Sequence, residues 1–213
     1  MFDTTTLDVK KLKQLEGDFL MRYPQGFDDP EMLEIRKKHR VEKMVELTQQ
    51  SFKKRACSNI HITVDNMVKV INRSSMISMF EKPKFRDFAN NLGENDKAFL
   101  VKALYQMLYG KQQLGFEAMV DILRTEKLAK WSLLTIIPAY FNPTEDVFVK
   151  PTTAKGVLRH FEVDDPIYKP APTWDFYQKY RALINDAKAQ VNENLSPSNA
   201  AFSGFLMMSV ATQ

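Results

Sequence analysis

Cysteine and glycine are scarce in this chain of 213 residues, and their scarcity excludes several classes of protein. The single cysteine, Cys57, cannot form an internal disulfide, which excludes a disulfide-bonded scaffold and is typical of a reducing compartment. The seven glycines form neither a dinucleotide-binding loop nor a phosphate-binding loop for nucleoside triphosphates. The sequence also lacks a Gly-x-Ser-x-Gly elbow and the protein-kinase motifs, so the common signatures of hydrolases and kinases are missing.

Long hydrophobic runs are missing as well. The longest apolar stretches lie near 131–139 and 202–210, well short of the roughly 20 residues that a membrane-spanning helix needs. The first residues carry the acidic Asp3 ahead of any apolar run and have no small-residue cleavage site, unlike a secretory signal peptide. We therefore expect a cytoplasmic protein without a membrane partner.

Residues that bind metal ions or cofactors form no recognisable motif. His39, His61 and His160 are far apart, and none has a second histidine or a cysteine at metal-ligand spacing. The sequence therefore predicts no metal site and no cofactor. Because a nucleophile, a base and an orienting group cannot be named together, the sequence favours a non-catalytic protein.

The composition is that of a folded globular protein with a small excess of positive charge. Hydrophobic residues make up 44% of the chain and recur along almost its whole length, which excludes intrinsic disorder. Lysine and arginine number 30 against 26 acidic residues, which gives a formal net charge of +4. This excess permits an anionic partner without requiring one.

Apolar residues recur mainly with the period of an α-helix, and few segments alternate with period two. We predict an all-α fold of about eight to ten helices, with at most one short extended segment near 147–149. The helices form either a single domain or two lobes, 1–92 and 94–213, with a soft boundary at Gly93. The expected helices cover 6–21, 29–52, 64–80, 83–92, 96–109, 114–128, 131–140, 151–161, 174–192 and a short segment from 196 onward.

Several helix starts carry local signals. Asp29 followed by Pro30 predicts a capped start with proline at the first helical position. Thr173 predicts a second capped start. The spacing of Thr5 and Asp8 resembles a capping box, with Asp in place of the usual Glu or Gln.

A basic stripe is expected along the helix over 29–52 and at its end. Between Arg36 and Arg55 the only acidic residues are Glu42 and Glu46. A phosphate backbone is the natural ligand for such a face, which predicts contact with nucleic acid. The alternative is a solvated helix face in which the acids pair with neighbouring lysines. The candidate residues are Arg36, Arg40, Lys43, Lys53, Lys54 and Arg55.

A second candidate segment, 168–181, mixes aromatic residues with cations. Aromatic rings stack on bases while lysine and arginine hold phosphates, which makes Trp174 and Tyr177 candidates for base stacking. The same two residues, three positions apart on the expected helix, also fit a stripe that faces the core. The sequence leaves both interpretations open.

The start of the helix expected at 151–161 is a candidate anion site. Pro151 opens this helix, and the free amides at a helix N-terminus attract anions. The candidate anion-binding residues are Thr152, Thr153 and Lys155. With a carboxylate as base, this end would suit an enzyme acting on a phosphorylated small molecule, whereas the alternative is simple capping by Thr152. The candidate bases are Asp164, Asp165 and Glu145.

Two further features each have a functional and a structural interpretation. Cations lie just before Cys57 and would lower its pKa, and His61 is the only nearby candidate base, but Ser58 and Asn59 are typical of a helix break, so we expect a passive cysteine. The segment 198–213 is too apolar to stay in water, so it docks either on this chain's own core or on another subunit.

We therefore expect a non-catalytic helical protein that contacts nucleic acid through its basic helix face. The first alternative is an assembly protein that forms homo-oligomers through 198–213. The second alternative is the enzyme with an anion site near 151–155.

Overall fold

The computed structural model describes residues 6–210 and confirms the all-α fold. No strand occurs within this part of the chain, and Val147 and Val149 are buried residues of a loop. Short 3-10 turns η1 (Gly26–Asp28), η2 (Ala56–Ser58) and η3 (Glu193–Leu195) join some of the α-helices. The α-helices are α1 (Val9–Arg22), α2 (Pro30–His39), α3 (Val41–Ser51), α4 (Ile60–Arg73), α5 (Glu81–Asn91), α6 (Glu94–Tyr109), α7 (Gln112–Arg124), α8 (Trp131–Phe141), α9 (Pro151–His160), α10 (Trp174–Lys188) and α11 (Asn199–Val210).

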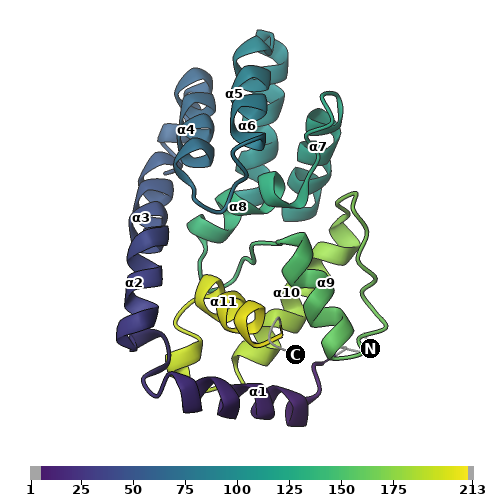
Figure 1. Ribbon diagram of the computed structural model, residues 1–213. Coiled ribbons are helices and arrows are strands. Elements are labelled where there is room, and N and C mark those ends of the chain that lie inside the picture. The colour runs from purple at the N-terminus through teal and green to yellow at the C-terminus, as the bar shows by residue number, and fades with distance from the viewer. Residues whose placement is uncertain (1–5, 211–213) are drawn as a thin grey trace.

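The helices form a bundle in which the first and last helices are neighbours. Helices α4 to α7 lie together in the upper part of Figure 1, and α8 crosses beneath them. Helix α1 runs along the lower edge, where it packs against α11, and α11 packs in turn on α9 and α10. Helices α2 and α3 follow one side of the molecule and join its lower and upper parts.

Side-chain caps explain where several helices begin. The Asp29 carboxylate accepts a hydrogen bond from the Glu31 amide, and Pro30 occupies the first turn of α2, as predicted. The Thr173 hydroxyl caps α10 in the same way, as predicted. Helix α1 is capped by Asp8 and begins at Val9. The predicted partner of Asp8 in a capping box, Thr5, lies outside the described residues.

The prediction of one continuous helix over 29–52 was wrong. Arg40 adopts a left-handed backbone conformation (φ 51°, ψ 37°), which ends α2 and turns the chain into α3. A non-glycine residue seldom adopts this conformation, so an apolar pattern that continues across Arg40 does not indicate that a helix ends there. The bend brings Glu42, in the first turn of α3, within hydrogen-bonding distance of Arg36 on α2.

The helix predicted over 64–80 is also corrected. Helix α4 begins at Ile60 because the Asn59 side chain caps it, and it ends at Arg73 because Ser74 is extended. The Ser74 hydroxyl is buried and hydrogen-bonds to Tyr140 of α8, which fixes the chain where it leaves the helix. The segment 74–80 is consequently a loop rather than the last two turns of a helix.

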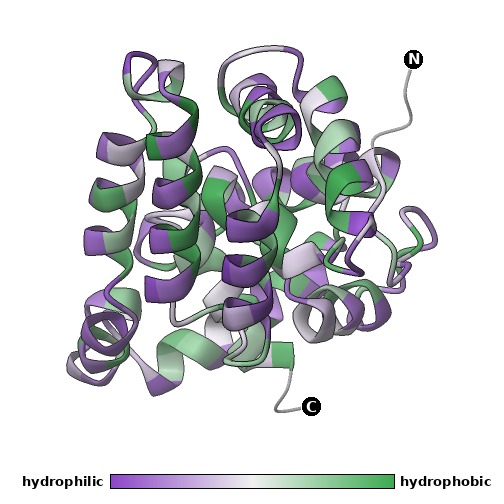
Figure 2. Ribbon diagram, turned by 90° about the horizontal axis from the view of Figure 1, so that it is seen from above, coloured by the Kyte–Doolittle hydropathy of each residue, from purple (hydrophilic) through white to green (hydrophobic). Residues whose placement is uncertain are grey.

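The buried apolar side chains form a single connected core. Its largest members are aromatic, including Trp131, Phe52 and Phe116. Most helices in Figure 2 alternate between hydrophilic and hydrophobic stretches, as amphipathic helices do. Contacts cross the predicted boundary at Gly93, since α4 packs on both α6 and α8. Whether 1–92 and 94–213 behave as separate lobes stays a prediction.

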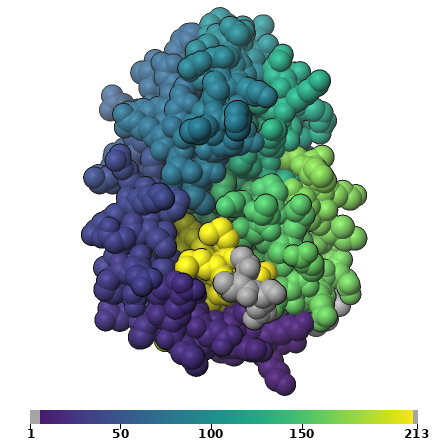
Figure 3. Space-filling view, viewed as in Figure 1, coloured from purple at the N-terminus to yellow at the C-terminus, as the bar shows by residue number. Residues whose placement is uncertain are grey.

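One face of the apolar C-terminal helix is buried against this chain's own core. The Phe202, Phe205 and Leu206 side chains of α11 are fully buried. The ring of Phe205 meets the ring of Phe19 edge to face at 5.3 Å, which attaches α11 to α1. In Figure 3 the α11 surface is framed by purple α1 residues and green residues of α9. Homo-oligomer formation through 198–213 stays a prediction, and residues 211–213 lie outside the described part of the chain.

Candidate functional site

The basic residues expected on one helix face are divided by the bend at Arg40. Arg36 is held by two carboxylates, at 3.2 Å from Asp28 and 2.7 Å from Glu42. Partial burial raises the pKa of the Glu42 carboxyl, but the hydrogen bond and charge of Arg36 outweigh this effect and lower it overall. Arg36 is therefore largely neutralised, whereas Arg40, at the bend, and Lys43, on α3, are exposed.

Three of the predicted cations lie together where α3 ends and η2 begins. Lys53, Lys54 and Arg55 are all exposed. The ammonium group of Lys54 lies 5.2 Å from the centre of the Tyr109 ring, a cation–π contact. The Tyr109 hydroxyl donates a 2.8 Å hydrogen bond to the Phe52 carbonyl, which fixes the ring beside the start of this cationic segment.

Half-buried aromatic rings continue from Tyr109. Its ring centre is 5.3 Å from that of Tyr105, one turn earlier on α6, and 5.3 Å from that of Phe141 at the end of α8. Gln49 of α3 donates a hydrogen bond to the Phe141 carbonyl and so joins α3 to the same corner. We call this surface the cationic–aromatic strip. It comprises Lys53, Lys54, Arg55, Tyr105, Tyr109 and Phe141.

The two aromatic residues predicted to stack on bases, Trp174 and Tyr177, are divided between the surface and the core. Tyr177 is 1% exposed and stacks on Phe116 with ring centres 5.3 Å apart. It has no face for a base, so we remove Tyr177 from the candidate interface and assign it to the core-facing stripe. Trp174 is half-buried, and the Arg181 guanidinium lies 5.7 Å from its ring centre.

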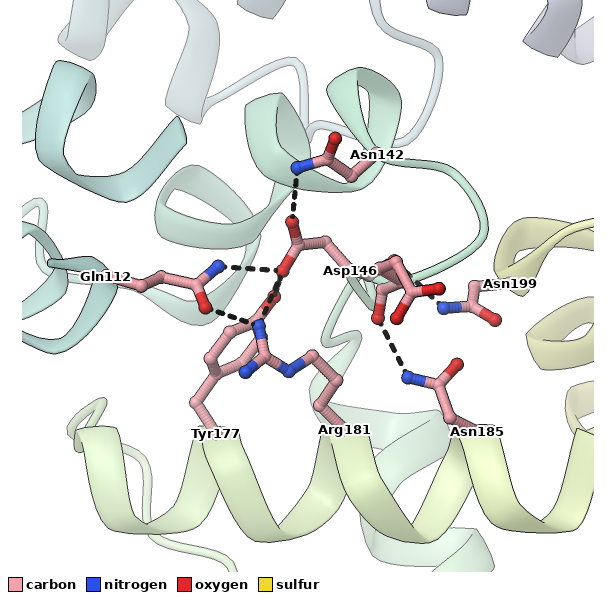
Figure 4. Close-up of polar contacts among 8 residues, drawn as sticks. Gln112, Asn142, Asp146, Tyr177, Arg181, Asn185 and Asn199 are labelled. Atoms are coloured by element: carbon pink, nitrogen blue, oxygen red, sulfur yellow. Dashed lines mark hydrogen bonds and ion pairs between the residues drawn. The ribbon is translucent and has the colours of Figure 1, made fainter. Parts of the chain in front are cut away.

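A buried carboxylate, Asp146, organises the region between these residues (Figure 4). Its Oδ1 accepts hydrogen bonds from Gln112 Nε2 (3.0 Å), the Tyr177 hydroxyl (3.0 Å) and Arg181 Nη1 (2.9 Å). Its Oδ2 accepts one from Asn142 Nδ2 at 3.0 Å. Asp146 is 2% exposed, and these donors satisfy a charge that would otherwise be costly to bury.

Asparagines of two helices extend this network. Asn199 of α11 donates to the Asp146 carbonyl, and Asn185 of α10 donates to the Glu145 carbonyl. Burial is the main reason that the pKa of Tyr177 is raised well above its ordinary value, and the nearby Asp146 charge adds to it. The Tyr177 hydroxyl therefore stays protonated and acts as a donor.

The network connects the cationic–aromatic strip to Trp174. Phe141 precedes Asn142, whose side chain donates to Asp146. Asp146 pairs with Arg181, which lies over the Trp174 ring. Lys54 and Trp174 are thus joined through Tyr109, the adjacent residues Phe141 and Asn142, Asp146 and Arg181, although 120 positions separate them in the sequence.

Sequence reasoning missed the rings of the strip and the acid of the network. Tyr105 and Tyr109 are four residues apart on the helix expected at 96–109, and this spacing was the available signal. The sequence near Asp146 does not distinguish it from the neighbouring Glu145, because three of its four side-chain donors come from α7 and α10.

The predicted anion site is only partly assembled. Thr152 and Thr153 line a pocket of about 290 Å³ between α9 and α11. The other lining residues are Lys150, Gly156, Arg159, Leu206, Met207 and Val210. Lys155 lies elsewhere, with its ammonium group 5.8 Å from the Tyr168 ring centre. No side chain caps α9, so the expected cap by Thr152 does not form.

The carboxylates proposed as bases lie outside the lining of this pocket. Asp165 pairs with Lys179 at 3.1 Å, and neither Asp164 nor Glu145 lines the pocket. The hydroxyls and a candidate base are therefore not brought together in the lining of this pocket, and the enzyme alternative stays a prediction.

Cys57 has the features of a structural cysteine, as we expected. Its side chain is buried, its thiol donates a weak hydrogen bond to the Phe52 carbonyl, and burial raises its pKa. His61 is exposed and lies 3.2 Å from the Glu94 carboxylate, on the surface.

The described residues form neither a cluster of metal ligands nor a membrane-spanning helix. Across residues 6–210, no three His, Cys, Asp or Glu side chains are grouped so that they could share a metal ion. None of the described helices combines the length and the apolar character needed to cross a bilayer. Comparison of the chain with models of protein families, with curated proteins and with solved structures gave no match.

Proposed function

We propose that this protein is a non-catalytic binding protein that holds a single strand of nucleic acid on the cationic–aromatic strip. The observation that carries the proposal is the contact between Lys54 and Tyr109. It brings an exposed cationic segment next to a row of half-buried rings. Proteins that bind single strands combine these two features, because cations track the phosphates and rings stack on bases.

The charge of the strip supports this proposal. Lys53, Lys54 and Arg55 are exposed, and none of them forms an ion pair with a carboxylate among residues 6–210. Their charge is therefore available to phosphates, unlike that of Arg36. Binding of this kind releases counterions, so affinity should fall as salt rises.

The rings of the strip favour a single strand over a duplex. Base faces are accessible to aromatic side chains only where the bases are unstacked. Tyr105, Tyr109 and Phe141 each keep part of their side chain in contact with solvent. Trp174, joined to the strip through Asp146 and Arg181, offers a further partly exposed ring.

The proposal is tested by fluorescence polarisation with labelled single-stranded DNA, single-stranded RNA and duplex DNA. We expect the single strands to bind more tightly than the duplex. The affinity should fall steeply between about 20 mM and about 200 mM salt. No binding at the lower salt concentration would overturn the proposal.

Two charge-reversal variants locate the contact. Lys53→Glu/Lys54→Glu should weaken binding at least about tenfold and reduce the salt slope by about 1.4, at about 0.7 for each lost contact with a single strand. Lys37→Glu/Lys38→Glu changes the net charge equally but alters α2, and it should have a much smaller effect. If the α2 variant is the weaker binder, the strip is not the binding surface.

An aromatic substitution tests base stacking separately from charge. Tyr105→Ala removes a half-buried ring that forms no hydrogen bond through its hydroxyl with a described residue. Loss of one stacked base should cost about 1–3 kcal/mol of binding free energy without changing the salt slope. Unchanged affinity would mean that Tyr105 does not stack on a base.

A further inference from the structure

The loop between α4 and α5 exposes apolar side chains that the core does not use. Met79 and Phe80 are 80% and 79% exposed, and Met76 is exposed as well. Leaving a phenylalanine and a methionine side by side in water is unfavourable, and exposed apolar groups that adjoin one another mark interaction sites. We call residues 74–80 the apolar loop.

Cations flank the apolar loop on both sides. Arg73 precedes it and Lys82 and Lys84 follow it, and within residues 6–210 none of the three pairs with a carboxylate. From 66 to 86 the only acidic residue is Glu81. Its carboxylate is already engaged, 3.5 Å from Lys130 and hydrogen-bonded to a serine of α8. The chain on both sides of the loop therefore carries an excess of positive charge.

We propose that the apolar loop binds the surface of an anionic lipid bilayer. Met79 and Phe80 would enter the boundary between headgroups and acyl chains, while Arg73, Lys82 and Lys84 would contact anionic headgroups. Exposed apolar groups bordered by cations match both layers of such a surface. The contact is peripheral and needs no membrane-spanning helix, and the proposal departs from the expectation, drawn from the sequence, of no membrane partner.

The proposed membrane contact is independent of the cationic–aromatic strip. The cations of the strip lie just before η2, which leads into α4, whereas the apolar loop follows the other end of α4. Helix α4 has 14 residues and is therefore about 21 Å long. An assay can therefore show membrane binding without nucleic-acid binding, or nucleic-acid binding without membrane binding.

The test is flotation of the full chain with phosphatidylcholine vesicles and with vesicles that also contain phosphatidylserine. We expect the protein to float with the anionic vesicles at low salt, to be released by added salt, and to bind neutral vesicles much more weakly. Failure to bind anionic vesicles at low salt would overturn the proposal. Equal binding to both kinds of vesicle would also overturn it, because the cations would then have no part.

Paired variants identify the loop as the contact. Met79→Ala/Phe80→Ala should lower the partition coefficient on anionic vesicles by at least about tenfold, since two apolar side chains no longer leave water. Met21→Ala/Ile167→Ala removes side chains that are similarly exposed, at 83% and 70%, and should change it less than about twofold. Equal effects of the two double variants would overturn the proposal.

Separate variants test the part played by the cations and the depth to which the loop enters the bilayer. Lys82→Glu/Lys84→Glu should abolish the preference for anionic vesicles. Phe80→Trp should give a blue-shifted fluorescence on vesicle binding that brominated lipids quench, because the new ring enters the acyl region. If Phe80→Trp is not quenched, the ring does not enter the acyl region and the proposal is overturned. If sedimentation velocity shows that Met79→Ala/Phe80→Ala instead dissociates a dimer, a second copy of this chain rather than a bilayer covers the loop.

Discussion

Replacing Arg181 by methionine is the sharpest test of the network around Asp146. The substitution keeps most of the side-chain volume beside Trp174 but removes the cation that lies 2.9 Å from the Asp146 carboxylate. The carboxylate is buried, so it cannot regain its lost partner from bulk water without local opening. We expect Arg181→Met to lower the free energy of unfolding by about 2–3 kcal/mol.

The magnitude follows from what remains after the substitution. Removing one partner of a fully buried ion pair costs about 3–5 kcal/mol. Two features of this site reduce that cost. The Arg181 side chain is 24% exposed, so solvent already screens part of the interaction. Three neutral donors, from Gln112, Asn142 and Tyr177, still hold the carboxylate.

A double-mutant cycle separates the ion pair from the loss of packing. Asp146→Asn keeps the shape of the side chain but turns an amide group toward donors. The double variant Asp146→Asn/Arg181→Met should be more stable than the sum of the single losses predicts, by at least about 1 kcal/mol. Urea unfolding followed by the fluorescence of the buried Trp131 provides the free energies.

A null cycle would refute this reasoning. If the coupling free energy is below about 0.5 kcal/mol, the charges of Asp146 and Arg181 do not stabilise one another, and the network is held by packing alone. A thermal scan offers a second check. A loss of 2–3 kcal/mol corresponds to a fall of about 4–12 °C in Tm for a chain of this size.

Three other predictions concern stability and reactivity. Gly115→Ala should destabilise the protein by about 1–3 kcal/mol, because the new methyl group would meet the backbone of α6. Gly17→Ala, in open space on α1, should stabilise the protein by about 0.5–1 kcal/mol. Urea unfolding compares the two variants. Burial raises the pKa of Tyr180, so the contribution of its protonated hydroxyl to stability is fully present below about pH 10 and is lost as the pH rises further. The free energy of unfolding of Tyr180→Phe should therefore fall less steeply with rising pH in alkali than that of the unchanged protein. Cys57 should react with thiol reagents only after unfolding, and rapid reaction of the native protein would contradict its burial.

The parts of the fold that could be predicted depend on neighbours in the sequence. The start of α2 follows from Asp29 and Pro30, and the start of α10 follows from Thr173, because a cap acts within one helical turn. The all-α class follows from the helical period of the apolar residues. The passive state of Cys57 was expected from the helix-breaking pair that follows it.

The parts that could not be predicted depend on distant contacts or on a single backbone angle. The left-handed conformation of Arg40 interrupts a pattern that continues on both sides of it. Tyr177 has the same helical spacing whether it faces a base or Phe116, and only the packing of α7 on α10 distinguishes the two. The loop after α4 was assigned to the helix whose apolar set is Val64, Met67, Val68 and Ile71, although the buried Ser74 hydroxyl holds the chain in another direction.

The two proposed surfaces lead to a joint prediction, in which the claim for either surface can fail without the other. Their cations flank the two ends of α4, which is about 21 Å long, about twice the Debye length of about 10 Å at 0.1 M salt. Lys53→Glu/Lys54→Glu should therefore weaken nucleic-acid binding at this salt concentration and leave vesicle binding unchanged. Lys82→Glu/Lys84→Glu should do the opposite, and both variants are measured in both assays. If each variant weakens both kinds of binding equally, the overall positive charge of the chain, rather than either local arrangement of cations and apolar side chains, attracts the anionic partner.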